Sequence, residues 1–161
     1  MGKNFAGWAE MKINGGENGS EITLRYGEKL DDKGLLDQTN INPHVYDGKV
    51  QTDKYIKKGS KSETFEPHFV YHGFRYIEVE GYPEKPSLND FTGKVLYSSF
   101  PESGSFKCSN NLLNKIQKLT KWSYISNFHS IPTDCPHREN HSGFLPRRAD
   151  VGFGCACFGA F

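Results

Sequence analysis

Short segments of alternating apolar and polar residues, separated by turn-forming clusters, constrain the first hundred residues most strongly. The segment EITLRYGEKL, residues 21–30, places Ile22, Leu24 and Tyr26 on one face and polar residues on the other. This period of two is typical of a β-strand with one buried face. The cluster NGGENGS before it predicts a turn, and the polar run LDDKGLLDQTN after it predicts a long loop between sheets.

Further stretches repeat this pattern and predict more strands. DKYIKKGSKSETFEPHF predicts two short strands around a Lys-Gly-Ser turn, whereas GFRYIEVEGYPEKP and FTGKVLYSSF each predict one. Several short strands with turns between them are typical of an antiparallel β-sandwich, and an aromatic content of 14% suits a core between two sheets. The predicted core positions are Leu24, Tyr26, Tyr55, Phe69, Tyr71, Tyr76, Ile77 and Val79.

The pattern changes near residue 104, where helical periodicity replaces alternation. SGSFKCS predicts a last short strand, and residues 110–129 then predict an amphipathic helix with Ser109 or Asn110 as its N-cap and Pro132 as its stop. Its apolar stripe consists of Leu112, Leu113, Ile116 and Leu119. One helix cannot bury its own stripe, so it either packs on the sandwich or begins a helical domain.

Composition argues against some classes of partner. The 161 residues carry a formal net charge of +1, which disfavours nucleic acid or an acidic membrane surface, because phosphate binding requires a concentrated basic surface. The first residues contain no apolar signal segment, and no apolar run is long enough to span a bilayer. The spacing of the four cysteines, Cys108, Cys135, Cys155 and Cys157, predicts neither a disulfide framework nor a zinc pair.

A cluster of chemically active residues follows the predicted helix in the stretch PTDCPHRENHSGF. Asp134, Arg138 and Glu139 lie within six positions of one another. Glycoside hydrolysis requires a carboxylic acid that protonates the leaving oxygen, and an adjacent arginine can hold hydroxyl groups or tune the acid. Chemistry alone leaves two alternatives open, a solvated surface loop and a zinc site built from Cys135, His137 and His141.

Several quoted segments together resemble the bacterial α-L-rhamnosidases of glycoside hydrolase family 78. PTDCPHRE resembles the signature that opens their catalytic region, and GKNFAGW resembles the start of their β-domain. The remaining segments, EITLRYGEKLDDKGLLDQTN, DKYIKKG, EPHFVYHGFRYIEVEGYP and SGSFKCSNNLLNKI, follow in family order and spacing. The resemblance covers roughly residues 2–139.

The resemblance implies a fold and a reaction. Its fold is mainly β, an antiparallel β-sandwich followed by a linker helix and the truncated start of an (α/α)₆ barrel. The implied reaction is the removal of terminal non-reducing α-L-rhamnose from glycosides or polysaccharides with inversion of configuration. The resemblance implies no metal or organic cofactor. An inverting pair of carboxyl groups stands about 6.5–9.5 Å apart, which leaves room for the attacking water.

The resemblance also implies roles for individual residues. Glu139 is expected to be the general acid, Asp134 to bind sugar hydroxyls, and Arg138 to lie in the same pocket. We expect Phe144 to replace the tryptophan that stacks on the sugar. The catalytic base is not expected within this chain.

The chain departs from the family pattern after Glu139. Residues 140–161, NHSGFLPRRADVGFGCACFGAF, lack the expected helical period, and Asp150 is the one remaining acid. We therefore expect a fragment whose residues 1–103 form the sandwich and whose residues 104–161 hold the linker helix and the edge of the catalytic barrel. Residues 140–161 are expected to be a frame error or foreign sequence, and the rest of the barrel is the partner missing from the chain.

Two other functions stay open at this level. A sandwich without its barrel could be a carbohydrate-binding module, or a structural domain that supports a partner. The rhamnosidase hypothesis is favoured because Asp134, Arg138 and Glu139 occur together, which a binding module does not require. His72 in YHGFRY is expected to be a packed or capping residue and not a ligand.

Overall fold

The computed structural model describes residues 1–41, 50–133 and 135–137 of the chain. The chain divides into two compact units, Met1–Leu96 and Tyr97–Phe161. The described strands of the first unit are β1 (Phe5–Asn14), β2 (Glu21–Gly27), β3 (Lys29–Leu30), β4 (Leu36–Asp37), β5 (Thr52–Ile56), β6 (Ser62–Phe65), β7 (His72–Phe74), β8 (Tyr76–Glu80) and β9 (Phe91–Val95). A 3₁₀ turn, Leu88–Asp90, precedes β9.

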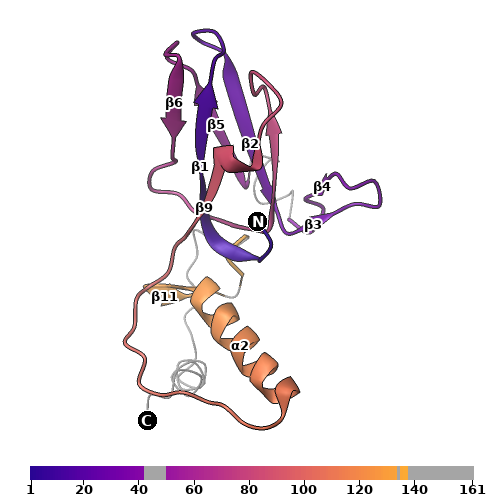
Figure 1. Ribbon diagram of the computed structural model, residues 1–161, viewed down its shortest axis with the longest axis vertical. Helices are drawn as coiled ribbons and strands as arrows, with labels where there is room; N and C mark the ends of the chain where they lie inside the picture. The colour runs from indigo at the N-terminus through magenta and orange to yellow at the C-terminus, as the bar shows by residue number, and fades with distance from the viewer. Residues whose placement is uncertain (42–49, 134, 138–161) are drawn as a thin grey trace. The chain divides into compact units, whose positions relative to one another are not determined.

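The strands of the first unit form two main antiparallel sheets (Figure 1). In one sheet β1 pairs with β6, β7 and β9, and in the other β2 lies between β5 and β8. Residue Gly7 of β1 pairs with both His72 of β7 and Val95 of β9. The mainly β, antiparallel sandwich expected from the alternation is thereby confirmed.

The chain crosses between the two sheets at several points, including the short segments between β5 and β6 and between β7 and β8. β5 and β6 are consecutive, yet β5 pairs with β2 and β6 pairs with β1. The prediction of one continuous strand over GFRYIEVEG is wrong, because this segment also changes sheet. It divides at Arg75 into β7, which pairs with β1, and β8, which pairs with β2. Alternation detects extended chain but carries no signal for a change of sheet.

Strand β1 pairs with three other strands, β6, β7 and β9. Sequence analysis predicted no strand at its residues. Its backbone passes so close to β9 that a Cβ on Gly7, where φ is 154°, would lie 1.8 Å from the Lys94 carbonyl oxygen. Glycine is therefore required at this position. The small residues Ala6 and Gly7 weaken the strand signal at the point where the close approach requires them.

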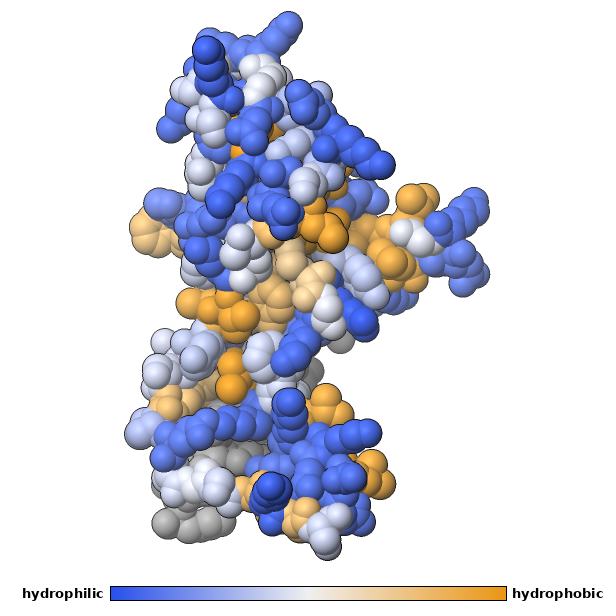
Figure 2. Space-filling view, viewed as in Figure 1, coloured by the Kyte–Doolittle hydropathy of each residue, from blue (hydrophilic) through white to orange (hydrophobic). Residues whose placement is uncertain are grey.

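The core lies between the two sheets and consists of side chains from β1, β2 and β7. Its buried apolar residues are Phe5, Ala6, Ala9, Met11, Ile13, Ile22, Leu24, Tyr26 and Phe74. Leu24 and Tyr26 were predicted core residues and are confirmed, whereas Tyr55, Tyr71, Tyr76, Ile77 and Val79 are half-buried. Figure 2 shows that the viewed face of this unit is mostly hydrophilic.

Two expectations for the connecting segments of the first unit are wrong. Phe69 is fully exposed with a φ of 64°, because it lies in the turn between β6 and β7, where the two-residue period of a strand does not apply. The run LDDKGLLDQTN contains the β3–β4 hairpin, in which Asp31 accepts hydrogen bonds from the backbone N–H groups of Lys33 and Leu35. Figure 1 shows this hairpin projecting from the sandwich.

The second unit contains helix α2 (Asn111–Ser126) and the two short strands β10 (Phe128–His129) and β11 (Ile131–Pro132). Asn110 is the N-cap, as expected, and its side chain accepts hydrogen bonds from the N–H groups of Leu112 and Leu113. The apolar stripe Leu112, Leu113, Ile116 and Leu119 is 47–68% exposed. No helix among the described residues is long and apolar enough to cross a membrane.

Two local predictions for the second unit are wrong. The segment SGSFKCS forms no strand. Pro132 does not end the helix, because α2 stops at Ser126 with Asn127 as its C-cap, and Pro132 lies in β11 opposite Phe128. The Asn127 side chain donates to the Ser123 carbonyl oxygen at 2.8 Å, which satisfies one acceptor at the helix end.

A buried ion pair stabilises the crossing between β5 and β6. Lys57, 1% exposed, places its Nζ 3.1 Å from Oε1 of Glu63. Tyr55 donates its hydroxyl to Glu63 Oε2 at 2.6 Å, and the N–H groups of Lys58 and Ser60 also donate to this carboxylate. The Tyr55 hydrogen bond, followed by those from Lys58, Lys57 and Ser60, lowers the pKa of Glu63 to about 2.

Replacing Glu63 with Gln should lower the unfolding free energy at neutral pH. It should also make the unfolding free energy depend less on pH in the acidic range. The folded carboxyl has a pKa of about 2 against an ordinary 4.5, so its charged form stabilises the fold above about pH 4.5. This contribution is lost as the pH falls from 4.5 toward 2. Urea denaturation across this range measures the change in unfolding free energy.

Glu21→Gln provides a matched control, because Glu21 forms an exposed ion pair with Lys54 and such pairs contribute little. It should leave stability at neutral pH nearly unchanged. A Glu63→Gln curve parallel to that of the unmodified chain would contradict the assigned role of Glu63.

Candidate functional site

All four predicted site residues, Asp134, Arg138, Glu139 and Phe144, lie outside the described residues. The structure describes the chain that leads into the signature PTDCPHRE and five of its residues, Pro132, Thr133 and residues 135–137. Of these, His137 is 6% exposed and Cys135 is half-buried. The zinc alternative also includes His141, which lies outside the described residues, and the described parts of the chain contain no group of three potential metal ligands.

The chain enters the signature through the β10–β11 hairpin. Helix α2 ends at Ser126, and the carbonyl oxygen of the next residue, Asn127, accepts hydrogen bonds from the Thr133 N–H at 2.8 Å and the Thr133 hydroxyl at 3.3 Å. The five residues between them form the hairpin, with Ser130 at its tip in a left-handed conformation, φ 66°. This closure therefore fixes Pro132 and Thr133, the first two residues of the signature PTDCPHRE.

The segment before the helix packs against the same hairpin. Ser98 donates its N–H to the Phe128 carbonyl oxygen at 2.9 Å, and its hydroxyl accepts the Ser130 N–H at 2.6 Å. The ring of Phe100 lies edge-on to Phe128 at 4.7 Å, and Phe128 contacts Tyr124 of α2 at 5.3 Å. Sequence reasoning missed Ser98, because a single serine 36 positions before Asp134 carries no recognisable signal.

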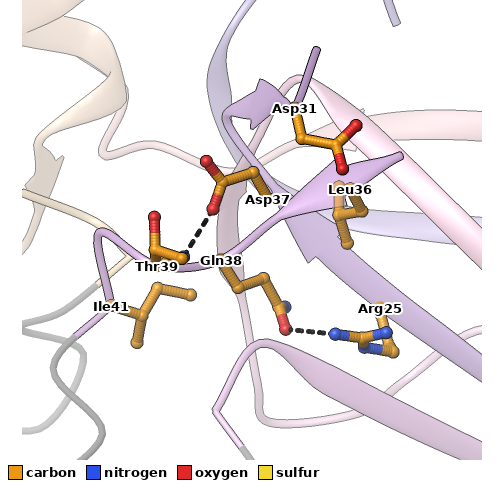
Figure 3. A pocket seen from close by; sticks show the side chains of 7 residues that line it. All are labelled: Arg25, Asp31, Leu36, Asp37, Gln38, Thr39 and Ile41. Atoms are coloured by element: carbon orange, nitrogen blue, oxygen red, sulfur yellow. Dashed lines mark hydrogen bonds between the residues drawn. The ribbon is translucent and has the colours of Figure 1, made fainter. Parts of the chain in front are cut away.

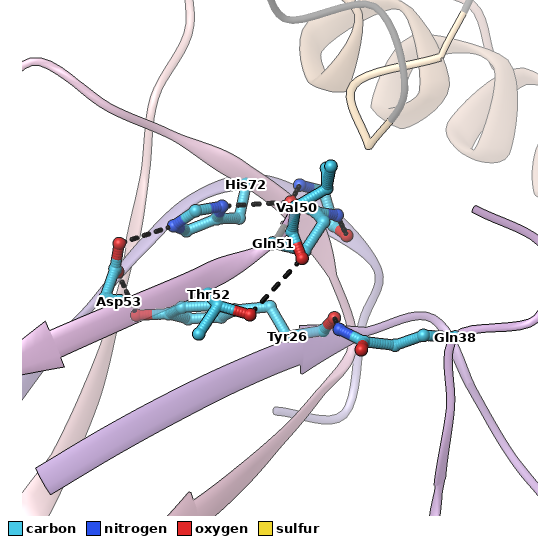
Figure 4. A network of polar contacts seen from close by, with 8 residues as sticks. Tyr26, Gln38, Val50, Gln51, Thr52, Asp53 and His72 are labelled. Atoms are coloured by element: carbon cyan, nitrogen blue, oxygen red, sulfur yellow. Dashed lines mark hydrogen bonds and ion pairs between the residues drawn. The ribbon is translucent and has the colours of Figure 1, made fainter. Parts of the chain in front are cut away.

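A second candidate is the buried polar cluster of the sandwich, formed by Tyr26, Gln51, Asp53 and His72 (Figure 4). Asp53 accepts the Tyr26 hydroxyl at 2.8 Å and faces His72 Nε2 at 3.0 Å. Gln51 faces His72 Nδ1 at 3.0 Å through its Oε1, and its Nε2 donates to the Gly73 carbonyl oxygen at 2.7 Å. Both ring nitrogens of His72 thus face side-chain oxygens of neighbouring strands.

This buried cluster is structural. The Tyr26 ring stacks on His72 with centroids 4.2 Å apart and is itself fully buried. Burial and the adjacent Asp53 raise the pKa of Tyr26, so the phenol remains a hydrogen-bond donor. The polar atoms of the cluster bond one another and the Gly73 backbone, and its four residues are at most 9% exposed. His72 is a packed residue, as expected from the sequence.

A third candidate is an open groove of about 680 Å³ beside the β3–β4 hairpin (Figure 3). Its lining residues are Arg25, Asp31, Leu36, Asp37, Gln38, Thr39 and Ile41. The Arg25 guanidinium donates to Glu78 at 2.6 Å and to Gln38 at 3.0 Å, while Asp37 accepts from Lys29 and from the Thr39 N–H. Hydrogen bonds, chiefly with Lys29 and Thr39, lower the pKa of Asp37 to about 2.

The groove offers little to a ligand. Its charged groups are already paired with one another or with neighbouring strands, and among the described residues its lining includes no aromatic ring on which a sugar could stack. It is best explained as the junction of the β3–β4 hairpin with β2.

Two family models match the chain in succession. The bacterial α-L-rhamnosidase concanavalin-like domain matches residues 1–97, and the bacterial α-L-rhamnosidase 6 hairpin glycosidase domain matches residues 101–148. A sandwich followed by the start of a helical glycosidase domain defines the class of protein. The chain belongs to the bacterial α-L-rhamnosidase family.

Individual relatives agree with this assignment. An α-L-rhamnosidase of Streptomyces avermitilis is 36% identical over 144 residues, covering 89% of this chain and 13% of that protein. One of Formosa agariphila is 37% identical over 143 residues, covering 86% of this chain and 14% of that protein.

Solved structures show the same likeness. The α-L-rhamnosidase of Dictyoglumus thermophilum superposes with a TM-score of 0.78 at 43% identity, over 86% of this chain and 15% of that one. The Streptomyces avermitilis enzyme, solved in complex with L-rhamnose, gives 0.76 at 37% identity, over 86% of this chain and 13% of that one. The chain therefore spans about one seventh of the length of these relatives.

Replacing Asp53 with Ala should destabilise the sandwich strongly, because it leaves the Tyr26 hydroxyl and His72 Nε2 buried without their acceptor. Breaking a buried pair in this way typically costs about 3–5 kcal/mol. Asp53→Asn should cost less, since an amide oxygen still accepts one hydrogen bond. Chemical denaturation measures both.

Lys54→Ala on the same strand is the matched control, because Lys54 pairs with Glu21 at the surface. Exposed pairs contribute about 0–1 kcal/mol. Equal losses for Asp53→Ala and Lys54→Ala would show that the buried cluster does not stabilise the fold.

Proposed function

We propose that this chain is part of an α-L-rhamnosidase that removes terminal non-reducing α-L-rhamnose from glycosides or polysaccharides by an inverting mechanism. The observation that carries the proposal is the succession of two matches, a sandwich at 1–97 and a glycosidase domain at 101–148, with PTDCPHRE inside the second. The proposed domains are 1–103 for the sandwich and 104–161 for the linker helix and the edge of the barrel.

The proposed chemistry assigns one role to each signature residue. Glu139 protonates the glycosidic oxygen as it leaves, and Asp134 binds sugar hydroxyls. Arg138 lies in the same pocket, where its guanidinium can hold hydroxyl groups. Phe144 offers an apolar face to the sugar ring.

Inversion requires a second carboxylate, which activates water on the opposite face of the sugar. In the described residues 97–133 and 135–137 the one carboxylate is Glu102, and it is bonded to Lys121. We place the base in the remainder of the helical barrel, because the relatives extend well beyond the seventh of their length that is matched here. The substrate is a rhamnosylated glycoside, and the barrel is the structural partner of the sandwich.

The 161-residue chain by itself should show no detectable hydrolysis of an aryl α-L-rhamnoside. Without a base on the opposite face, no water is activated for attack. Release of the phenol, followed by absorbance, measures this, with the Streptomyces avermitilis enzyme as positive control. Turnover by the isolated chain that disappears in Glu139→Gln would place the whole site within these residues and overturn the expectation.

In the complete enzyme, Glu139→Gln should reduce hydrolysis far more for substrates with poor leaving groups than for activated aryl rhamnosides. A poor leaving group requires protonation, whereas an activated phenolate departs without it. General acid catalysis contributes about 10²–10⁴-fold, so the two substrate classes should differ by a factor of this order. Comparing kcat/KM for the two classes measures the effect.

Asp134→Asn provides the contrast. A residue that holds sugar hydroxyls should lower kcat/KM similarly for both classes, since its contact does not depend on the leaving group. Equal losses on both classes for Glu139→Gln would remove the general-acid role from Glu139.

A further inference from the structure

We infer that Ser98 is a positioning residue for the signature loop, although it lies 36 residues before Asp134 and outside the signature. Its hydrogen bonds to the β10–β11 hairpin hold the start of the signature in place for catalysis. The inference rests on the proposed rhamnosidase function, because it assigns Ser98 an effect on the reactivity of Glu139.

Ser98 bonds the hairpin at two points. Its N–H donates to the Phe128 carbonyl oxygen in β10 at 2.9 Å, and its hydroxyl oxygen accepts the Ser130 N–H at 2.6 Å. Both bonds involve backbone groups of the hairpin, so they define its position independently of its side chains. The second is made by the Ser98 side chain and can be removed by a single substitution.

The Ser130 contact acts on a strained residue. Ser130 has a φ of 66°, a left-handed conformation that is uncommon for residues other than glycine and asparagine. Such conformations persist where surrounding contacts hold them. The Ser98 hydroxyl supplies a partner for the Ser130 N–H at this tip, so its removal loosens the turn where the hairpin is weakest.

The other end of the hairpin transmits this position to the signature. The Asn127 carbonyl oxygen accepts both the N–H and the hydroxyl of Thr133, and Asp134 follows directly. The hairpin comprises only the residues between Asn127 and Thr133, so a shift at Ser130 moves Thr133, the second residue of the signature. Misplacement of a catalytic group by about 1 Å can lower the rate about 10²-fold.

Ser98 is itself held in place by the aromatic residues that follow it. The ring of Phe100 lies 4.7 Å from Phe128 in an edge-on arrangement, and 6.4 Å from Tyr124 of α2. The segment 98–100 is therefore packed on both the hairpin and the helix end. The Ser98 hydroxyl that accepts the Ser130 N–H therefore lies on a segment with packing contacts of its own.

The test uses the complete enzyme with the variants Ser98→Ala, Ser98→Thr and Ser99→Ala. Ser98→Ala should lower kcat on rhamnosides with poor leaving groups by about 10–100-fold, and on activated aryl rhamnosides by much less, because a misplaced acid matters only where protonation is needed. Ser98→Thr retains the hydroxyl and should restore most of the rate. Ser99 is an exposed neighbour, and its replacement should change neither rate.

The ratio of the rate loss on poor leaving groups to the rate loss on activated ones separates a positioning role from a merely structural role. If Ser98→Ala only unfolds part of the protein, both substrate classes lose activity in parallel with the folded fraction measured by thermal denaturation, and the proposal is overturned. It is also overturned if Ser98→Ala matches the unmodified enzyme, or if Ser98→Thr fails to restore the ratio.

Hydrogen exchange in the 161-residue chain distinguishes failure of this inference from failure of the proposed function. The Ser130 amide should exchange faster in Ser98→Ala than in Ser98→Thr, whatever reaction the enzyme catalyses. If the Ser130 amide exchanges faster in Ser98→Ala but the unmodified enzyme does not hydrolyse rhamnosides, the rhamnosidase assignment is overturned. The hydrogen bond from Ser130 to Ser98 then still holds the hairpin. Unchanged exchange would overturn this role of the hydrogen bond itself.

Discussion

The buried carboxylate of Asp53 is the constraint on which the sandwich depends. A carboxylate at 9% exposure requires partners, and it finds them on both sheets, Tyr26 on β2 and His72 on β7. Asp53 thereby connects the two sheets through hydrogen-bond contacts inside the core. Buried polar groups favour one packing over others in some proteins, and this cluster is placed to act in that way.

The same requirement recurs where the chain crosses between sheets. Lys57 lies almost entirely buried beside Glu63, and four donors converge on the Glu63 carboxylate. A crossing segment cannot complete a strand ladder, so its backbone and charged groups need other partners. Polar contacts of this kind allow consecutive strands such as β5 and β6 to belong to different sheets.

The second unit uses backbone hydrogen bonds to place a reactive loop. Helix α2 ends at Ser126, and the carbonyl oxygen of its C-cap Asn127 closes the hairpin through Thr133, while Ser98 holds the hairpin tip. The residues proposed to carry the chemistry follow at once. A precise local scaffold ahead of the signature is consistent with the accuracy that acid catalysis demands of its donor.

Local pattern alone determined the class of fold, the amphipathic helix with its Asn110 cap, and the grouping of Asp134, Arg138 and Glu139, because strand alternation, helix caps and motif spacing are all expressed within a few neighbouring residues. Tertiary structure decided that β1 is central, that GFRYIEVEG divides between two sheets, that Phe69 is exposed and that Ser98 meets Ser130. These outcomes depend on contacts between residues far apart in the chain, whose energies no short stretch of sequence displays.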